Sequence, residues 1–251
     1  MRILGYNAQV SIATLAAAGL IIFVTHLISA ITGYGSVLLA LPLLAWLTGD
    51  LNTVVLALLV VGTVQAYHIL CLNVRYVQWR ELRRMLVWMG IGLPVGYACR
   101  QYLPLTPLLA ALGVVLVLAG LSRLLPGRER SIPRAILTLL LLAGGVIHGA
   151  FACGGATLVV YAEQTLKRKE VFRGTLFMAW VVLNTALIAG AVANKSFNTK
   201  VGQLALVGLP VVLLGNWLGE AIAKRTRQEV FMRLVAALLV VAGVITIARV
   251  L

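Results

Sequence analysis

Two glycine-rich breaks interrupt long apolar runs of the chain, and each is followed by a short apolar stretch. The first is Gly33-Tyr34-Gly35-Ser36 and the second is Cys153-Gly154-Gly155-Ala156-Thr157. A helix that begins inside an apolar layer exposes N–H groups without intrahelical partners, and these groups and the helix dipole favour an anion. Glycine also lets a ligand approach the backbone closely. We therefore predict that both breaks bind a small anion. The alternative is that the glycines only permit tight helix packing.

Polar side chains within the apolar runs are further candidates. His26 precedes the first break and His148 precedes the second, at nearly equivalent positions. Ionisable residues inside a membrane are functional candidates, and histidine titrates near neutral pH, so both could couple transport to protons. The alternative is that each bonds to a backbone carbonyl of a neighbouring helix. Gln65, Asn184 and Asn216 either line the site or join helices.

The composition is that of a polytopic membrane protein. Of the 251 residues, 61% are hydrophobic and only 11% are charged, and the mean hydropathy is +1.02. A soluble domain carries about 25% charged residues. Because one span needs about 20 apolar residues, the length allows about eight to ten spans and excludes a sizeable soluble domain.

The apolar runs should all be helices, since open strands leave backbone groups unsatisfied in lipid. Those at 36–47 and 156–166 reach only about 15–18 Å, about half of the hydrocarbon core. They are therefore expected to be re-entrant or parts of broken helices. The runs lie at 10–32, 36–47, 51–71, 85–100, 106–124, 135–153, 156–166, 171–193, 201–222 and 230–250.

The two halves of the chain are similar to each other. Gly35 matches Gly155 at an offset of 120 residues. Further on, "GLPVG" at 92–96 recurs as "GLPVV" at 208–212, and the offset has drifted by a few residues. Matches in the same order indicate a duplication. We predict an all-α bundle of two repeats, 1–125 and 126–251, with about five helical elements each. Because five is odd, the repeats should be inverted, so that the short helices enter from opposite faces and meet near the midplane.

The formal net charge of +14 fits a membrane orientation better than nucleic-acid binding. The basic residues gather in short loops that are expected to be cytoplasmic and to face lipid headgroups, with both termini external. The external loop 194–200 is an exception, because it carries Lys195 and Lys200. The four basic clusters are Arg75, Arg80, Arg83 and Arg84; Arg123, Arg128, Arg130 and Arg134; Lys167, Arg168, Lys169 and Arg173; and Lys224, Arg225, Arg227 and Arg233.

The chain as a whole resembles the sulfite exporter TauE/SafE family of membrane transporters. The residues that carry the resemblance are "ITGYGSVLLALPLL", "GAFACGGATLVVYA", "LKRKEVFRGTLFMAWVVLNTAL" and the recurrent "GLPVG". The chain departs from the family where Tyr34 and Ser36 interrupt the first glycine run, and where the second half lacks the proline that Pro42 supplies in the first. The resemblance implies export of sulfite or of a small organosulfonate such as sulfoacetate.

The sequence therefore predicts a secondary transporter that exports a small sulfur-containing anion across the cytoplasmic membrane, with proton coupling as an option. An anion channel, or a transporter of another small carboxylate or oxyanion, is the alternative. No carboxylate is evident at midplane, which argues against a cation. No HExxH, nucleophile–base pair or phosphate-binding loop is present, so we expect no enzyme, catalytic residue, metal or cofactor. No nucleic-acid partner is expected; a soluble partner subunit and a homo-oligomer are left open.

Overall fold

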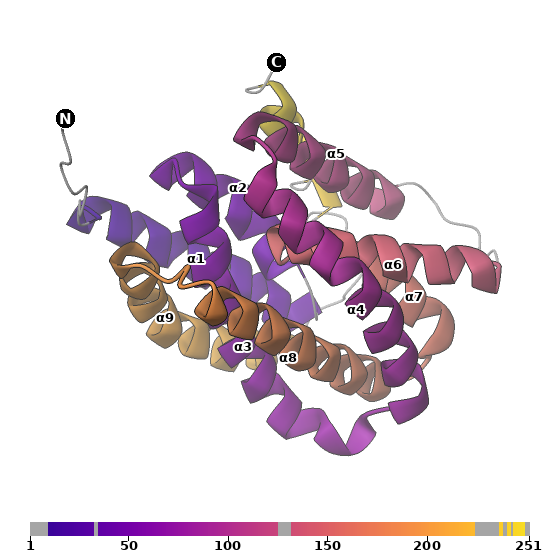
Figure 1. The fold of residues 1–251 in the computed structure, drawn as a ribbon. Helices are drawn as coiled ribbons and strands as arrows, with labels where there is room; N and C mark the ends of the chain where they lie inside the picture. The colour runs from indigo at the N-terminus through magenta and orange to yellow at the C-terminus, as the bar shows by residue number, and fades with distance from the viewer. Residues whose placement is uncertain are drawn as a thin grey trace.

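The computed structural model describes residues 10–32, 35–124, 132–223, 236–237, 240–241 and 243–248, and this part of the chain is helical without a strand. Figure 1 shows the helices as one bundle. The all-α prediction is confirmed. The elements are α1 (Ile12–Thr32), α2 (Ser36–Thr48), α3 (Leu51–Asn73), a 3-10 turn (Val74–Tyr76), α4 (Trp79–Tyr102), α5 (Leu105–Leu124), α6 (Arg134–Phe151), α7 (Gly155–Thr165), α8 (Lys169–Ala193) and α9 (Thr199–Ala223).

Five of the described helices are long and apolar enough to cross a membrane, while α2 and α7 have only 13 and 11 residues. The helix α4 is as long as the spans but begins at Trp79, earlier than predicted. Three of the four arginines expected in the loop 72–84 therefore lie in its first turns, where their charged heads reach the polar edge of the bundle. The five candidate spans are Ile12–Ile31, Leu51–Tyr76, Arg134–Phe151, Glu170–Ala193 and Thr199–Ile222.

Local signals in the sequence set the ends of the short helix α2. Gly35 precedes it with φ 98°, a left-handed conformation that glycine adopts at little cost, and Gly49 ends it with φ 66°. Asp50 then caps α3, because its carboxylate accepts a hydrogen bond from the Thr53 backbone N–H at 3.0 Å. Only two residues, Gly49 and Asp50, separate the end of α2 from the start of α3.

The helices α3 and α8 are antiparallel at the centre of the bundle. A Cβ on Gly174, near the start of α8, would lie 2.6 Å from the carbonyl oxygen of Asn73, the last residue of α3. At the other end, the Asn198 side chain, just after α8, donates to the Thr53 hydroxyl at 3.3 Å. Equivalent helices of the two halves therefore run in opposite directions, as inverted repeats require.

The short helices return to opposite sides of the bundle. The end of α2 meets the start of α1, because Leu47 and Thr48 share a cavity wall with Val10 and Thr14. The helix α7 runs the other way, and the Tyr161 hydroxyl donates to a carboxylate at the start of α4. Each short helix thus turns back toward the end of the bundle at which the preceding long helix began, as a re-entrant helix does.

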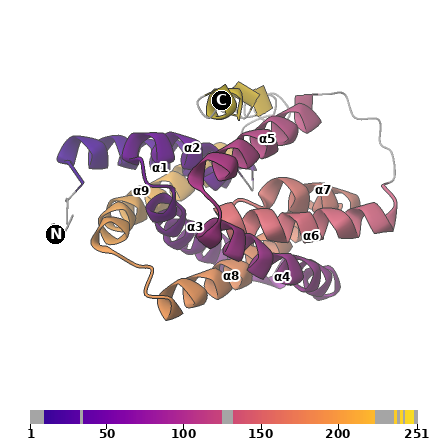
Figure 2. The same cartoon turned by 45° about the horizontal axis from the view of Figure 1, so that its top comes forward.

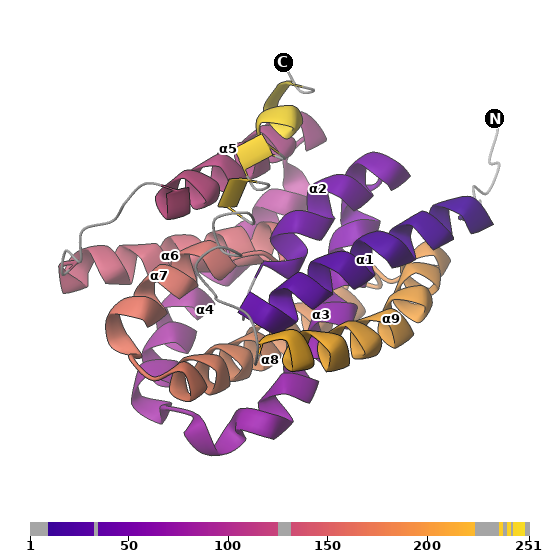
Figure 3. The same ribbon diagram turned by 180° about the vertical axis from the view of Figure 1, so that it is seen from behind.

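The outer helix pairs follow the same symmetry. The helix α1 lies along α9, and α4 lies along α6, with both pairs parallel; Figure 3 shows α1 beside α9. The helix α5 packs against the C-terminal residues, since a Cβ on Gly113 would lie 2.9 Å from the Gly243 carbonyl oxygen, and Figure 2 shows them together at one edge. The predicted repeat boundary at 125/126 lies outside the described residues, and the division into two domains stays a prediction.

Close approach of backbones holds α4 against α6, and this contact is testable. A Cβ on Gly96 would lie 1.8 Å from the Val146 carbonyl oxygen, whereas a Cβ on Gly90, on the same helix, would meet nothing within 4 Å. Gly96→Ala should therefore destabilise the protein by about 1–3 kcal/mol through overpacking. Gly90→Ala should leave the thermal unfolding midpoint in detergent unchanged. Equal midpoints for the two variants would contradict this packing.

Candidate functional site

A cavity of about 60 Å³ lies where the N-termini of α2 and α7 meet inside the bundle. A water molecule needs about 10–15 Å³, so the cavity has room for several waters or one small polyatomic ion. None of its described lining residues is acidic. The lining residues are Ser29, Gly35, Ser36, Val37, Leu38, Gly62, Gln65, Ala66, His148, Ala152, Cys153, Gly155, Phe177, Trp180 and Asn184.

The backbone of both short helices presents unpaired donors toward this region. The first intrahelical bond of α2 is from the Leu39 N–H to the Gly35 carbonyl, at 3.1 Å, and that of α7 is from the Leu158 N–H to the Gly154 carbonyl, at 3.4 Å. The residues at the cap positions are Gly35 and Gly154, which have no side chain to cap either N-terminus. The N–H groups of the three residues before Leu39 and before Leu158 therefore have no intrahelical acceptor. Two positive dipole ends thus converge on one cavity.

His148 is a buried polar side chain in the cavity wall, close to the side-chain amide of Asn184. It is 1% exposed, and neither ring nitrogen has a hydrogen-bond partner among the described residues. Its ring lies 5.2 Å from that of Trp180, tilted by 33°. An unpaired buried polar group is costly unless a ligand or water satisfies it. The position of His148 therefore indicates a polar occupant of the cavity.

His26 has a different environment although it is nearly equivalent in sequence. Its Nδ1 lies 2.8 Å from the Ile22 carbonyl oxygen, so this nitrogen carries the proton and donates. The carbonyl belongs to its own helix rather than to a neighbouring one, which differs from the alternative weighed above. His26 is fully buried, and it is not among the residues that line the cavity.

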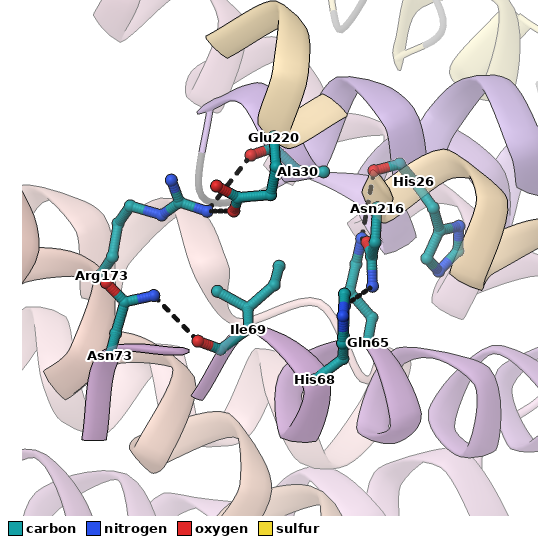
Figure 4. A network of polar contacts seen from close by, with 9 residues as sticks. All are labelled: His26, Ala30, Gln65, His68, Ile69, Asn73, Arg173, Asn216 and Glu220. Atoms are coloured by element: carbon teal, nitrogen blue, oxygen red, sulfur yellow. Dashed lines mark hydrogen bonds and ion pairs between the residues drawn. The ribbon is translucent and has the colours of Figure 1, made fainter. Parts of the chain in front are cut away.

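Gln65 joins three helices beside the cavity, as Figure 4 shows. Its side-chain amide donates to the His26 carbonyl oxygen at 3.1 Å and to the Asn216 side-chain oxygen at 2.7 Å. The Asn216 amide in turn lies 3.2 Å from Nδ1 of His68. Asn216 therefore connects α9 to α3 and does not reach the cavity, whereas Gln65 does both.

The structure brings together part of the predicted anion site. Gly35, Ser36, Cys153 and Gly155 line the cavity, as do His148, Gln65 and Asn184. Gly33 and Tyr34 lie outside the described residues. The cavity walls do not include Gly154, Ala156, Thr157, His26 or Asn216.

Gly154 illustrates why part of the second break is not in the cavity wall. A Cβ on Gly154 would lie 2.3 Å from the Gly144 carbonyl oxygen, so this glycine permits close packing of α7 on α6. The Thr157 hydroxyl donates to the Gly154 carbonyl at 3.2 Å and is thereby used within the turn. The packing interpretation of the glycines therefore holds for Gly154, while Gly155 faces the cavity.

The sequence reasoning missed two aromatic residues of the cavity. Phe177 and Trp180 line it from α8 together with Asn184. Their spacing of three and four residues places them on one helix face. Two aromatic residues on the same helix face as Asn184 were therefore the signal in the sequence that pointed to this part of the cavity wall.

Charged contacts join the helices at the end that the basic residues assign to the cytoplasm. Arg173 of α8 forms an ion pair with Glu220 of α9 and approaches the Ala30 carbonyl oxygen of α1 at 3.5 Å (Figure 4). The Tyr161 hydroxyl of α7 donates to Glu81 of α4 at 2.6 Å. In the described part of the chain, no group of three His, Cys, Asp or Glu residues could hold a metal ion.

The amide pair between α3 and α9 allows a double-mutant cycle. Gln65→Leu leaves the His26 carbonyl and the Asn216 oxygen without this donor, so unfolding should become easier by about 1–3 kcal/mol. Combining it with Asn216→Leu should reveal a coupling of about 1 kcal/mol in unfolding free energy. Asn73, on the same helix as Gln65, bonds instead to its own helix at Ile69. A Gln65→Leu/Asn73→Leu cycle should show no coupling; equal coupling in both cycles would refute the contact.

The family model described as "Sulfite exporter TauE/SafE" matches residues 17–246. A curated relative, the probable inner membrane transporter protein TsaS of Comamonas testosteroni, is 27% identical over 177 residues, which cover 68% of this chain and 73% of the relative. No solved structure matches the chain.

Proposed function

We propose that this chain, which belongs to the sulfite exporter TauE/SafE family, exports sulfite or a small organosulfonate across the cytoplasmic membrane. Family membership makes it a membrane transporter and not an enzyme. The relative in Comamonas testosteroni is described as an inner membrane transporter, which supports the same location here. The observation that carries the proposal is the meeting of two helix N-termini at one buried cavity.

The electrostatics of this cavity favour an anion. Each helix N-terminus acts as roughly half a positive charge, and two of them point at the same space. No acidic residue lines the cavity to compensate for them. Backbone N–H groups, the Ser36 hydroxyl and the Asn184 amide are donors of the kind that oxyanions accept from. These donors are already in place, so they would replace the hydrogen bonds that an anion loses when it leaves water.

Alternating access would come from movement of one repeat against the other around this cavity. The ion pair of Arg173 with Glu220 ties α8 to α9 at the cytoplasmic end. The bond from Tyr161 to Glu81 ties the re-entrant helix α7 to α4 at the same end. The ion pair lies within the second repeat, whereas the bond from Tyr161 to Glu81 joins the two repeats and would have to open when they move apart at this end. Flux far above the turnover of a carrier, seen as conductance in a planar bilayer, would instead identify an anion channel.

Filling the cavity tests the site. A Cβ on Gly155 would lie 3.7 Å from Trp180, so alanine fits there in ordinary contact. Gly155→Leu would project further into the 60 Å³ space and should lower the flux of labelled sulfite in proteoliposomes at least about tenfold. Gly155→Ala should keep most of the flux.

The panel of anions gives this experiment its control. Labelled sulfite is compared with sulfate, acetate and sulfoacetate, and each variant is checked for membrane insertion. Normal sulfite flux in an inserted Gly155→Leu variant would show that the substrate does not pass through this cavity. Flux of acetate but not of sulfite through the unmodified chain would favour a carboxylate transporter.

Proton coupling, if present, should depend on His148 rather than on His26. His148 lines the cavity together with the neighbouring Asn184 side chain. His26 has a partner within its own helix. His148→Gln should therefore flatten the pH dependence of sulfite flux, while His26→Gln should leave it unchanged. An unaltered pH profile in His148→Gln would remove this residue from coupling.

A further inference from the structure

A second, larger cavity of about 460 Å³ lies at the end of the bundle opposite the basic loops. It lies between the start of α3, the end of α4 and the connection from α8 to α9. We call it the outer cavity. Its lining residues are Asp50, Asn52, Thr53, Leu56, Arg100, Gln101, Tyr102, Ser196 and Asn198.

Arg100 is a buried cation in this wall, and the described residues form no ion pair with it. It is only 6% exposed, and its Nη1 atom is buried with no hydrogen-bond partner in the described part of the chain. Its guanidinium carbon lies 5.1 Å from the centre of the Tyr97 ring, which is a weak contact. A buried charge with no opposite charge is strongly unfavourable unless something compensates for it.

Asp50 is the one carboxylate among the lining residues of the outer cavity, and both of its oxygens accept hydrogen bonds. Asp50 accepts hydrogen bonds from the Thr53 N–H at 3.0 Å and from the Thr53 hydroxyl at 2.7 Å. Both carboxylate oxygens thus cap α3. No ion pair or hydrogen bond joins Asp50 to Arg100. Asp50 keeps its negative charge, but it makes no direct contact with the guanidinium among the described residues, so an anion could approach Arg100 from the rest of the wall.

The position equivalent to Arg100 in the other half of the chain carries no charge. Because "GLPVG" at 92–96 matches "GLPVV" at 208–212, Arg100 is equivalent to Asn216. Asn216 is neutral and is held by Gln65 and His68. Arg100 stands at the same place in the other half and has no such partners. Packing therefore does not account for a positive charge at this position.

Two further cations lie on the same side of the bundle, where the orientation rule predicts few. Lys195 is exposed in the connection from α8 to α9, near the Ser196 that lines the outer cavity. Lys200 lines a neighbouring cavity of about 170 Å³ that also contacts Asp50. Of the two lysines in the external exception, Lys195 is the one next to a residue of the outer cavity, and its charge adds to the positive potential there.

We propose that Arg100 and the outer cavity form a second subsite for a small oxyanion, on the external side of the central cavity. Arg100 lines the outer cavity and not the central one, so the two spaces have separate walls. The subsite would receive an exported anion before its release. The identity of the anion rests on the proposed function, while binding at Arg100 does not require transport.

The test measures anion binding to the purified full-length chain rather than flux. Sodium sulfite is titrated against sodium chloride at equal ionic strength, and the apparent dissociation constant comes from the rise of the thermal unfolding midpoint. Four chains are compared: the unmodified chain, Gly155→Leu, Arg100→Gln and the double variant. In the Gly155→Leu background, Arg100→Gln should weaken the remaining sulfite binding at least about tenfold, because it removes a charge-assisted hydrogen bond.

Two controls separate binding from folding. Arg75→Gln removes an exposed positive charge at the opposite end and should leave sulfite binding unchanged. Without anion, Arg100→Gln should unfold at the same temperature as the unmodified chain or higher, since an uncompensated buried charge is removed. A lower midpoint would indicate that Arg100 has a structural role instead. Arg100→Lys keeps the charge but loses the planar donor pair, so it should bind with intermediate affinity.

Each outcome decides one proposal. If Gly155→Leu binds sulfite equally with Arg or Gln at position 100, or shows no rise over chloride, the outer subsite is wrong. If Gly155→Leu matches the unmodified chain while Arg100→Gln loses binding, the outer subsite holds and the central site fails. If each variant removes part of the binding and the double variant removes all of it, both sites are supported.

Discussion

Two helices begin inside the apolar layer, and the rest of the bundle is arranged around that constraint. Their first backbone N–H groups have no intrahelical acceptors, and lipid supplies none. The chain therefore surrounds both starts with protein. Phe177 and Trp180 of α8 cover them together with Gly62 and Gln65 of α3. A buried polar space is the result, and it is the environment in which an anion would be most strongly held by N–H groups.

The inverted repeat makes it possible to bury two such starts at one place. Because α3 and α8 are antiparallel at the centre, α2 returns toward one face and α7 toward the other, with their N-termini inside. The parallel pairs α1 with α9 and α4 with α6 then enclose the centre. Small residues let these backbones come close, as at Gly96 and Gly219, where an added Cβ would clash with the neighbouring helix.

The sequence was sufficient to predict the helices, the two short elements and the cavity positions of Gly35, Cys153 and Gly155. These predictions follow from the lengths of the apolar runs, from the two glycine-rich breaks and from the internal repeat, which are strong signals in an apolar chain. The sequence could not show which side chains point into the cavity. Lipid and the protein interior are both apolar, so the periodicity of apolar residues does not separate the lipid-facing side of a helix from its buried side. His26 and His148 are nearly equivalent in sequence, yet only His148 lines the cavity. Arg100 was missed as a buried residue for the same reason.

The differences between equivalent positions define a direction across the bundle. A perfectly symmetric repeat would offer an anion the same route to either side. Here the end assigned to the cytoplasm is tied by Arg173 with Glu220 and by Tyr161 with Glu81. The opposite end instead has a cavity of about 460 Å³ and the unpaired charge of Arg100, where the other half carries Asn216. An ion pair and a hydrogen bond join helices at one end, and the buried guanidinium of Arg100 lies at the other, so the two ends of the bundle would present an anion with unequal environments.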